Sequence, residues 1–364
     1  MTSLTDLTRD ELARFVAEEL GEPAFRARQL WHWIWKKGAA SFSEMTDLSK
    51  ACRAKLTDIA RIDHPRIVAE QTSSDGTIKL LLELADGQCV ETVLIPSHSR
   101  EGKLRFSQCL STQVGCPMGC TFCSTGSMGF IRNMSMGEIL GQVLVGRARL
   151  RDNPDDPLLR NLVFMGMGEP LLNFRELMRS LETLNSEPGL SFSPRRITVS
   201  TCGIEKGILE LGQSGQAYLA VSLHAPTQEL REKIMPGAAR FPLDRLLALL
   251  KRYPLKARER LTFEYLLLGG VNDGPDQARE LARIMAHIKG KLNIILYNAA
   301  EGAPYKAPEP EAVDAFLNIL RKKHITATLR QSKGADIKAA CGQLRAEKEK
   351  KKDKENTGEG EPLF

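Results

Sequence analysis

The sequence predicts an α/β fold in which a partial barrel of six strand–helix units follows a small helical domain with a β-hairpin. A strand–helix rhythm runs from about residue 104 to residue 324, and such alternation is typical of a parallel sheet. The six units are too few for a complete eight-unit barrel, which needs ~250 residues. The residues before this region follow a different pattern, with helices first and a hairpin after them.

The N-terminal part is predicted to hold two helices and a hairpin. Apolar residues recur at helical spacing over residues 10–20, and Gly21 closes that segment. Residues 24–37 carry all three Trp residues, which we expect to form a buried aromatic face. Residues 77–95 alternate as two strands around Ala85-Asp86-Gly87, a pattern typical of a hairpin.

The second part is predicted to alternate strands with helices. Its strands are expected to end near residues 112, 165, 200, 223, 267 and 297. Its helices are expected at residues 136–150, 174–185, 205–213, 228–234, 243–253, 276–288 and 310–324. Ser135 and Glu138 form a capping-box pattern at the first of these helices. In such folds the site lies at the carboxyl ends of the strands, so polar residues there carry weight.

Three domains are predicted along the chain. Residues 1–96 form an accessory domain, and the polar, turn-rich residues that follow mark its boundary. Residues 97–345 form the partial barrel. Residues 346–364 form a charged tail of low complexity, which we expect to be disordered.

Composition favours a globular protein of the cytoplasm. The chain is 42% hydrophobic and carries a net charge of +6, a balance compatible with an RNA partner. It shows neither the pattern of a signal peptide nor an apolar run near the ~20 residues that span a bilayer. We therefore expect no membrane attachment, and cysteines that are metal-binding, catalytic or buried rather than disulfide-bonded.

The strongest chemical signal is the motif CxxxCxxC, formed by Cys116, Cys120 and Cys123 in the loop after the first barrel strand. Three thiolates this close together suit an iron–sulfur cluster. A structural zinc site needs four ligands, usually in two pairs, and no second pair follows. Three ligands on a [4Fe–4S] cluster leave one iron open, which can chelate the amino and carboxylate groups of S-adenosylmethionine (SAM). The motif thus predicts reductive cleavage of SAM to a 5′-deoxyadenosyl radical.

Polar residues near other strand ends outline a SAM site. Gly168 would let a ligand approach the backbone, and Glu169 could accept hydrogen bonds from its ammonium group. Other candidates are Ser200, Ser222, Leu223, His224 and Asn298.

In combination these motifs resemble those of the RlmN family of radical SAM enzymes, which methylate C2 of adenosine in 23S rRNA and in tRNA. The resemblance is carried by the cysteine motif followed by Ser124-Thr125-Gly126, by GMGEP at 166–170, by SLHAP at 222–226 and by ACGQL at 340–344. It covers nearly the whole chain, including the small N-terminal domain.

The resemblance implies a role for each candidate. The three cysteines of the motif would hold the cluster, and the seven residues from Gly168 to Asn298 named above would bind SAM. Cys341 would carry the methyl group as S-methylcysteine, Cys109 would be its resolving partner, and Glu91 would remove the proton from C2. The resemblance also implies two SAM molecules per turnover, RNA substrates, an electron donor such as flavodoxin or ferredoxin, and a monomer.

The chemistry explains why such residues are needed. C2 of adenine has neither a lone pair nor an acidic proton, so direct transfer from SAM cannot methylate it. In the family's route the first SAM methylates Cys341. A radical from the second SAM abstracts hydrogen from that methyl group. The resulting methylene radical adds to C2, Glu91 takes the C2 proton, and Cys109 attacks Cys341 to release the methylated base.

Other interpretations stay open. A sister activity methylates adenine C8 in 23S rRNA, although Pro170 and the QVGC lead-in to Cys116 favour C2. An RNA-binding protein with an iron–sulfur or zinc site would have no use for Cys341. A radical SAM enzyme acting on peptides or small molecules would not need the N-terminal domain. For RNA contact, the sequence offers only two weak candidates, Arg132 and Lys306.

Overall fold

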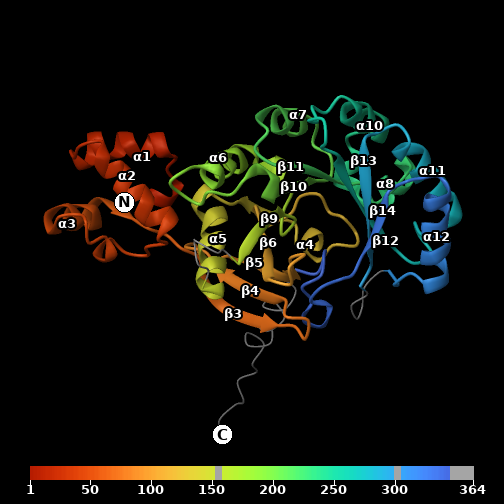
Figure 1. Ribbon diagram of the computed structural model, residues 1–364, viewed down its shortest axis with the longest axis horizontal. Helices are drawn as coiled ribbons and strands as arrows, with labels where there is room; N and C mark the ends of the chain where they lie inside the picture. The colour runs from red at the N-terminus through yellow and green to blue at the C-terminus, as the bar shows by residue number, and fades with distance from the viewer. Residues whose placement is uncertain (152–157, 299–304, 345–364) are drawn as a thin grey trace, which may run out of the picture.

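A ten-stranded sheet forms the centre of the protein, whose computed structural model describes residues 1–151, 158–298 and 305–344. Its strand order is β14-β13-β12-β11-β10-β9-β6-β5-β4-β3 (Figure 1). All neighbours from β6 to β14 pair in parallel, whereas β3 to β6 pair antiparallel. The strands are β3 (Arg66–Thr72), β4 (Ile78–Glu83), β5 (Cys89–His98), β6 (Leu104–Cys109), β9 (Leu159–Phe164), β10 (Ile197–Thr201), β11 (Tyr218–Ser222), β12 (Leu261–Leu267), β13 (Gly290–Leu296) and β14 (Ala327–Arg330).

Helices on the outer face connect the parallel strands, as the strand–helix rhythm predicts. They are α5 (Met136–Leu150), α6 (Phe174–Asn185), α7 (Glu205–Ser214), α8 (Gln228–Ile234), α9 (Pro236–Ala239), α10 (Leu243–Lys251), α11 (Pro275–Met285) and α12 (Pro310–Lys322). The predicted capping box at Ser135 and Glu138 is present at the start of α5. The α/β fold with a partial barrel is therefore confirmed.

Burial on both faces of the sheet explains why its strands read as apolar runs. In β12, Leu261, Phe263 and Tyr265 are fully buried, and the residues between them are at most partly exposed. Strand β14 was not predicted, because its side chains are mostly exposed and show no apolar alternation. It adds a seventh parallel strand to the six expected within the described residues.

The N-terminal residues form a helical unit beside α5 and α6 (Figure 1). Trp31 and Trp35 are buried there and meet edge to face, with ring centroids 5.8 Å apart. The expected aromatic face is thus confirmed for these two, whereas the indole of Trp33 donates to Asp47 near the surface. The elements of the unit are β1 (Thr2–Ser3), η1 (Leu4–Asp6), α1 (Arg9–Phe15), η2 (Val16–Leu20), α2 (Phe25–Trp31), η3 (His32–Lys36), η4 (Phe42–Glu44), α3 (Lys50–Ile59) and β2 (Ala60–Arg61).

The predicted hairpin forms as β4 and β5 and is continuous with the main sheet, because β5 pairs with β6. The domain boundary proposed near residue 96 thus lies inside a strand, β5, and the predicted division remains a prediction. The tail at 346–364 lies outside the described residues.

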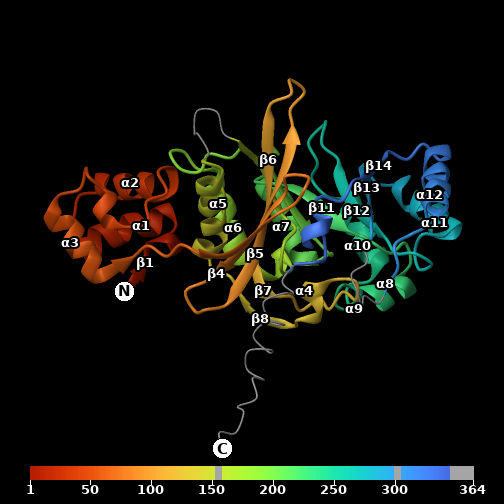
Figure 2. The ribbon, with the colours of Figure 1, turned by 90° about the horizontal axis from the view of Figure 1, so that it is seen from below.

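The carboxyl ends of the parallel strands meet on one side of the sheet. There lie β7 (Gln113–Gly115), α4 (Ser124–Ser127) and β8 (Phe130–Asn133), opposite the projecting turn between β5 and β6 (Figure 2). In the described part of the chain no helix combines the length and apolar character needed to cross a membrane.

Candidate active site

The cysteine motif occupies the loop between β7 and α4, at the carboxyl end of the sheet. Cys116, Cys120 and Cys123 are all half-buried. The amide of Cys116 donates to Gly129 and that of Cys123 to Cys120, so the loop folds back on itself. Its ends are therefore fixed by backbone hydrogen bonds.

The three thiols suit a cluster better than a single ion. Burial, and then charges on Cys123 and Cys116, raise the pKa of Cys120, which shows that the thiols lie close together. Fe–S clusters are held by cysteine thiolates, whereas a structural zinc site is usually closed by four protein ligands. The donor set therefore fits a [4Fe–4S] cluster.

A buried guanidinium lies behind this loop. Arg231, in α8, is fully buried, and its side chain donates to the carbonyl oxygens of Cys202 and Leu223. Its positive charge acts on both Cys120 and Glu169. An anionic cluster would gain electrostatic stabilisation from such a cation. The sequence analysis missed Arg231, since one Arg in a charged, amphipathic helix carries no distinguishing signal.

Gly168 and Glu169 form a tight turn after β9. Gly168 has φ +99°, and an added Cβ would lie 2.6 Å from the Cβ of Gln113, so glycine is required there. The buried carboxylate of Glu169 accepts from the amides of Leu171 and Cys202. Burial outweighs these bonds and raises its pKa. The side chains of Cys202 and Thr201 also hydrogen-bond to this carboxylate.

The ends of β10 and β11 supply the next candidates. The hydroxyl oxygens of Ser200 and Ser222 lie 3.2 Å apart, and Leu223 is fully buried beside them. His224 adopts φ +50°, a left-handed conformation that is uncommon for residues with a side chain and is found at functional sites. Burial, with the charge of Arg231, lowers the pKa of His224 to about 3, so the ring is neutral.

The imidazole ring of His224, which follows β11, contacts the cysteine loop. Nδ1 of His224 accepts from the amide of Leu266, which leaves the proton on Nε2. Phe122 meets the ring edge to face, with centroids 5.2 Å apart. His224 therefore contacts the loop that would hold the cluster.

The loop that carries Cys341 closes the site. The carbonyl of Gly342 accepts from the amide of Ser124 at 2.6 Å, and Gln343 donates to the carbonyl of Asn298. Gly342 has φ +84°, and an added Cβ would come within 3.3 Å of the carbonyl oxygen of Phe122. Cys341 is thus held against both the cysteine loop and the predicted SAM residue Asn298.

Cys341 and Cys109 lie near each other at the carboxyl end of the sheet. Cys341 is exposed to solvent, yet desolvation by surrounding protein is the largest cause that raises its pKa to about 11, followed by the charges of Glu264 and Cys123. Cys109 is buried at the end of β6, and burial followed by the charge of Cys341 raises its pKa.

Glu91 lies in β5 and is buried rather than solvated. Its backbone carbonyl accepts from Ser111 Oγ. Its carboxylate pairs with Lys79 at 3.5 Å. The sequence analysis missed Lys79 although a signal was present, because a lone Lys stands in the otherwise apolar start of a strand, IKLLLE.

Glu264, in β12, is a second buried carboxyl that was missed. It accepts from Asn293 on the neighbouring strand. Burial raises its pKa, and its charge reaches Cys341. A charged residue inside a buried strand is its only sequence signal.

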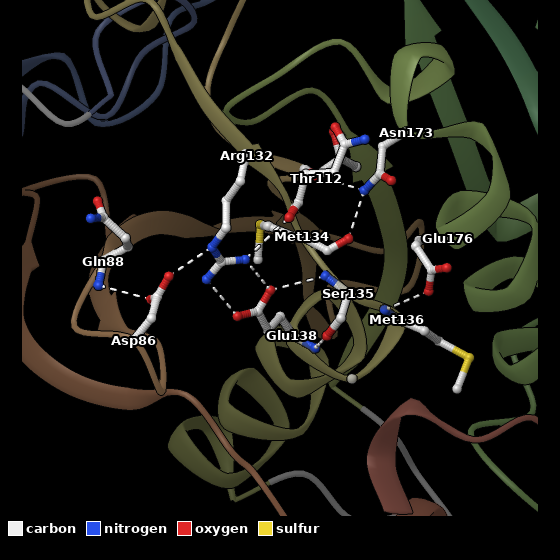
Figure 3. A network of polar contacts seen from close by, with 12 residues as sticks. Asp86, Gln88, Thr112, Arg132, Met134, Ser135, Met136, Glu138, Asn173 and Glu176 are labelled. Atoms are coloured by element: carbon white, nitrogen blue, oxygen red, sulfur yellow. Dashed lines mark hydrogen bonds and ion pairs between the residues drawn. The ribbon is translucent and has the colours of Figure 1, made fainter. Parts of the chain in front are cut away.

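The structure shows Arg132 in ion pairs within the protein, and its contact with phosphate stays a prediction. Its guanidinium binds Glu138 through two bonds of 2.7 and 2.8 Å and Asp86 through one of 2.7 Å (Figure 3). It therefore joins the hairpin turn to the start of α5. Lys306 is exposed beside Gly269, and its contact with RNA stays a prediction.

Comparison with known proteins agrees with this geometry. Residues 2–62 match the ribosomal RNA large subunit methyltransferase N-terminal domain, and residues 110–282 match the radical SAM superfamily. The dual-specificity RNA methyltransferase RlmN of Nitratidesulfovibrio vulgaris (strain DP4) is 67% identical over 347 residues, which cover 95% of each chain. The chain belongs to the RlmN family.

Other RlmN relatives extend this match over the full length. The RlmN protein of Solidesulfovibrio magneticus is 56% identical over 99% of this chain and 100% of its own. The crystal structure of a radical SAM methyltransferase from Sphaerobacter thermophilus superimposes with a TM-score of 0.88 at 42% identity, covering 95% of this chain and all of that one. The predicted family and the class of radical SAM RNA methyltransferase are confirmed, and the superfamily implies a [4Fe–4S] cluster and SAM.

Proposed function

We propose that this RlmN-family enzyme methylates C2 of an adenosine in 23S rRNA and in tRNA through a methyl group carried on Cys341. The observation that supports this most directly is the hydrogen bond from Ser124 to Gly342, which holds the Cys341 loop against the cysteine motif. A residue that receives a carbon group at a radical centre must lie beside that centre.

We assign the cofactors to the residues at the strand ends. Cys116, Cys120 and Cys123 would hold the cluster, and the predicted SAM residues would line the adjoining surface. When bound, the cluster supplies the electron that cleaves SAM to a radical. Arg231 would contribute a fixed positive charge, and the neutral ring of His224 would hold Phe122 and its loop in place.

The remaining residues would act on the methylated base. Cys341 would hold the carbon as a thioether, linked to C2 of the adenine. Glu91 would take the C2 proton while its electron pair returns to the ring. Cys109 Sγ would then attack Cys341 Sγ, so that a disulfide forms and the sulfur–carbon electron pair passes to the departing carbon, which takes up a proton to complete the methyl group. The unpaired electron left by the radical addition would return to the electron carrier. The enzyme would act as a cytoplasmic monomer and receive electrons from a carrier such as flavodoxin or ferredoxin.

The test is nucleoside mass spectrometry on 23S rRNA and tRNA incubated with reconstituted enzyme, SAM and reductant. We expect 2-methyladenosine from both RNAs. The appearance of 8-methyladenosine would replace the C2 assignment by the C8 alternative. Absence of any methylated nucleoside with a fully loaded cluster would contradict the proposal.

A further inference from the structure

Lys79 is a buried cation next to the proposed base. The side chains of Lys79 and Glu91 are each only 6% exposed, and Lys79 Nζ lies 3.5 Å from Glu91 Oε1. The two residues come from adjacent antiparallel strands, β4 and β5. Burying an ion pair costs desolvation free energy that a surface pair would not incur. Such a pair is weak evidence for stability.

The same ammonium group also reaches the loop of the methyl carrier. Lys79 Nζ lies 3.5 Å from the carbonyl oxygen of Lys338, three residues before Cys341. Lys79 thus contacts both Glu91, the proposed general base, and the chain segment that leads to Cys341.

Neighbouring contacts show that this junction is built firmly. In the turn between β3 and β4, Ser73 Oγ donates to Asp336 at 2.6 Å. The carboxylate of Asp75 accepts from the amide of Gly334 at 3.0 Å. The turn therefore anchors the beginning of the loop, and of the contacts from β4 and its preceding turn that of Lys79 is the closest in sequence to Cys341.

We propose that Lys79 is a positioning residue, which holds Glu91 ionised and fixes it relative to the Cys341 loop. The inference rests on the proposed function of Glu91 and Cys341. Lys79 takes no proton and forms no covalent bond in this role. The C2–H bond breaks, its electron pair stays in the ring, and the proton passes to Glu91. An adjacent ammonium favours the carboxylate that accepts it.

Two side chains that contact the Glu91 backbone carry no charge. Ser111 and Met167, which contact the Glu91 backbone, are neutral. Cys341 and Lys338 belong to the facing loop, and Lys338 meets Lys79 through its carbonyl rather than its ammonium group. Lys79 forms an ion pair with Glu91, the proposed general base, at 3.5 Å.

The test compares Lys79→Met and Lys79→Arg with Glu91→Gln. Arg66→Met is a matched control, because Arg66 pairs with Glu83 between β3 and β4 but is largely exposed. Three quantities are measured in reconstituted enzyme: methylation of Cys341, covalent protein–RNA adduct, and the pH profile of 2-methyladenosine formation. Melting temperatures report whether each variant folds.

We expect Lys79→Met to methylate Cys341 normally, since that step does not use Glu91. Methylation of RNA should fall about tenfold or more at neutral pH, and the adduct should accumulate. The acid limb of the pH profile should move up by about one unit or more, because a cation at this distance typically favours the charged carboxylate by about one to three units. Lys79→Arg should restore much of the rate, and Arg66→Met should match the native enzyme.

Two results would overturn the role of Lys79 but leave the proposed function intact. One is an unchanged pH profile without adduct in Lys79→Met. The other is loss of Cys341 methylation in a folded Lys79→Met protein, which would indicate a structural role. Normal turnover in Glu91→Gln would instead remove Glu91 from the proposed function, and this inference with it.

Discussion

Cys109 and Cys341 lie near each other at the carboxyl end of the barrel, although Cys109 ends strand β6 and Cys341 lies in the last described loop. Burial raises the pKa of Cys109, and the charge of Cys341 raises it further. One thiol is buried and the other is exposed to solvent. This arrangement suits a pair in which the exposed sulfur of Cys341 bonds to the substrate and the buried sulfur of Cys109 later attacks the Cys341 sulfur.

This pairing predicts a trapped intermediate in Cys109→Ala. Every step before the final attack can proceed, but no thiol is present to break the bond between Cys341 and RNA. The variant should accumulate a protein–RNA complex that survives denaturation and shrinks on nuclease treatment, visible by gel electrophoresis. The double variant Cys109→Ala/Cys341→Ala should show no complex. Normal turnover in Cys109→Ala would exclude a catalytic role, since a packing cysteine would lose only ~1 kcal/mol of stability.

The methyl group itself should be detectable on the enzyme. Protein from a methylating host should carry the mass of one additional CH₂ group on the peptide that contains Cys341. Cys341→Ala should lack this mass and produce no methylated RNA. Peptide mass spectrometry measures both. A modified Cys109 beside an unmodified Cys341 would reverse the two roles.

Each cysteine of the motif should be needed for the cluster. Substituting Ala for Cys116, Cys120 or Cys123 should abolish the iron–sulfur absorption band and the formation of 5′-deoxyadenosine. Cys52→Ala is the matched control, because Cys52 is buried in α3 of the helical unit. Iron analysis after anaerobic reconstitution measures whether each variant binds the cluster. Full iron content in any of the three variants would disprove the assignment of that ligand.

Arg132→Met should weaken the fold without weakening RNA binding. The change leaves Asp86 and Glu138 without their shared cation, and we expect a loss of about 1 kcal/mol in the free energy of unfolding. The salt dependence of RNA affinity should not change, whereas loss of a phosphate contact lowers its slope by about one. Lys306→Met provides the comparison at an exposed site. A reduced slope in Arg132→Met would restore the contact expected from the sequence.

The contribution of the Asp75 carboxylate, which accepts from the amide of Gly334, to stability should depend on pH. Burial alone would raise its pKa, but hydrogen bonds from Thr77 and Gly334 lower it to about 2, against an ordinary value of 3.8. A lowered pKa in the folded state stabilises the fold above about pH 4, and this contribution disappears as pH falls towards 2. Asp75→Asn should therefore be destabilised at neutral pH, with the difference from the native protein shrinking between pH 4 and pH 2 in denaturant titrations.

The control for that titration is Asp58→Asn, an exposed position in α3. Its difference from the native protein should be small at every pH. A difference for Asp75→Asn that stayed constant down to pH 2 would show that the carboxylate charge does not hold the loop.

Much of the fold could be predicted because its signals are local. Periodicity and capping located α5, α6 and α8 at the residues observed, since a helix forms from neighbours along the chain. Strand β14 was missed because it is exposed, and pairing rather than pattern defines it. The hairpin was predicted, but its continuity with the main sheet was not, because strand neighbours are chosen by the fold.

The same division holds at the candidate site. By itself the sequence determined the cysteine motif and the Gly168–Glu169 turn, because their chemistry depends on residues a few positions apart. Only the tertiary structure decided that Lys79 joins Glu91 to the Cys341 loop. It also decided that Arg231 lies behind the cysteine loop and that Arg132 forms ion pairs within the protein. These contacts link segments distant along the chain, and burial of charge, which selects their partners, exists only once the chain has folded.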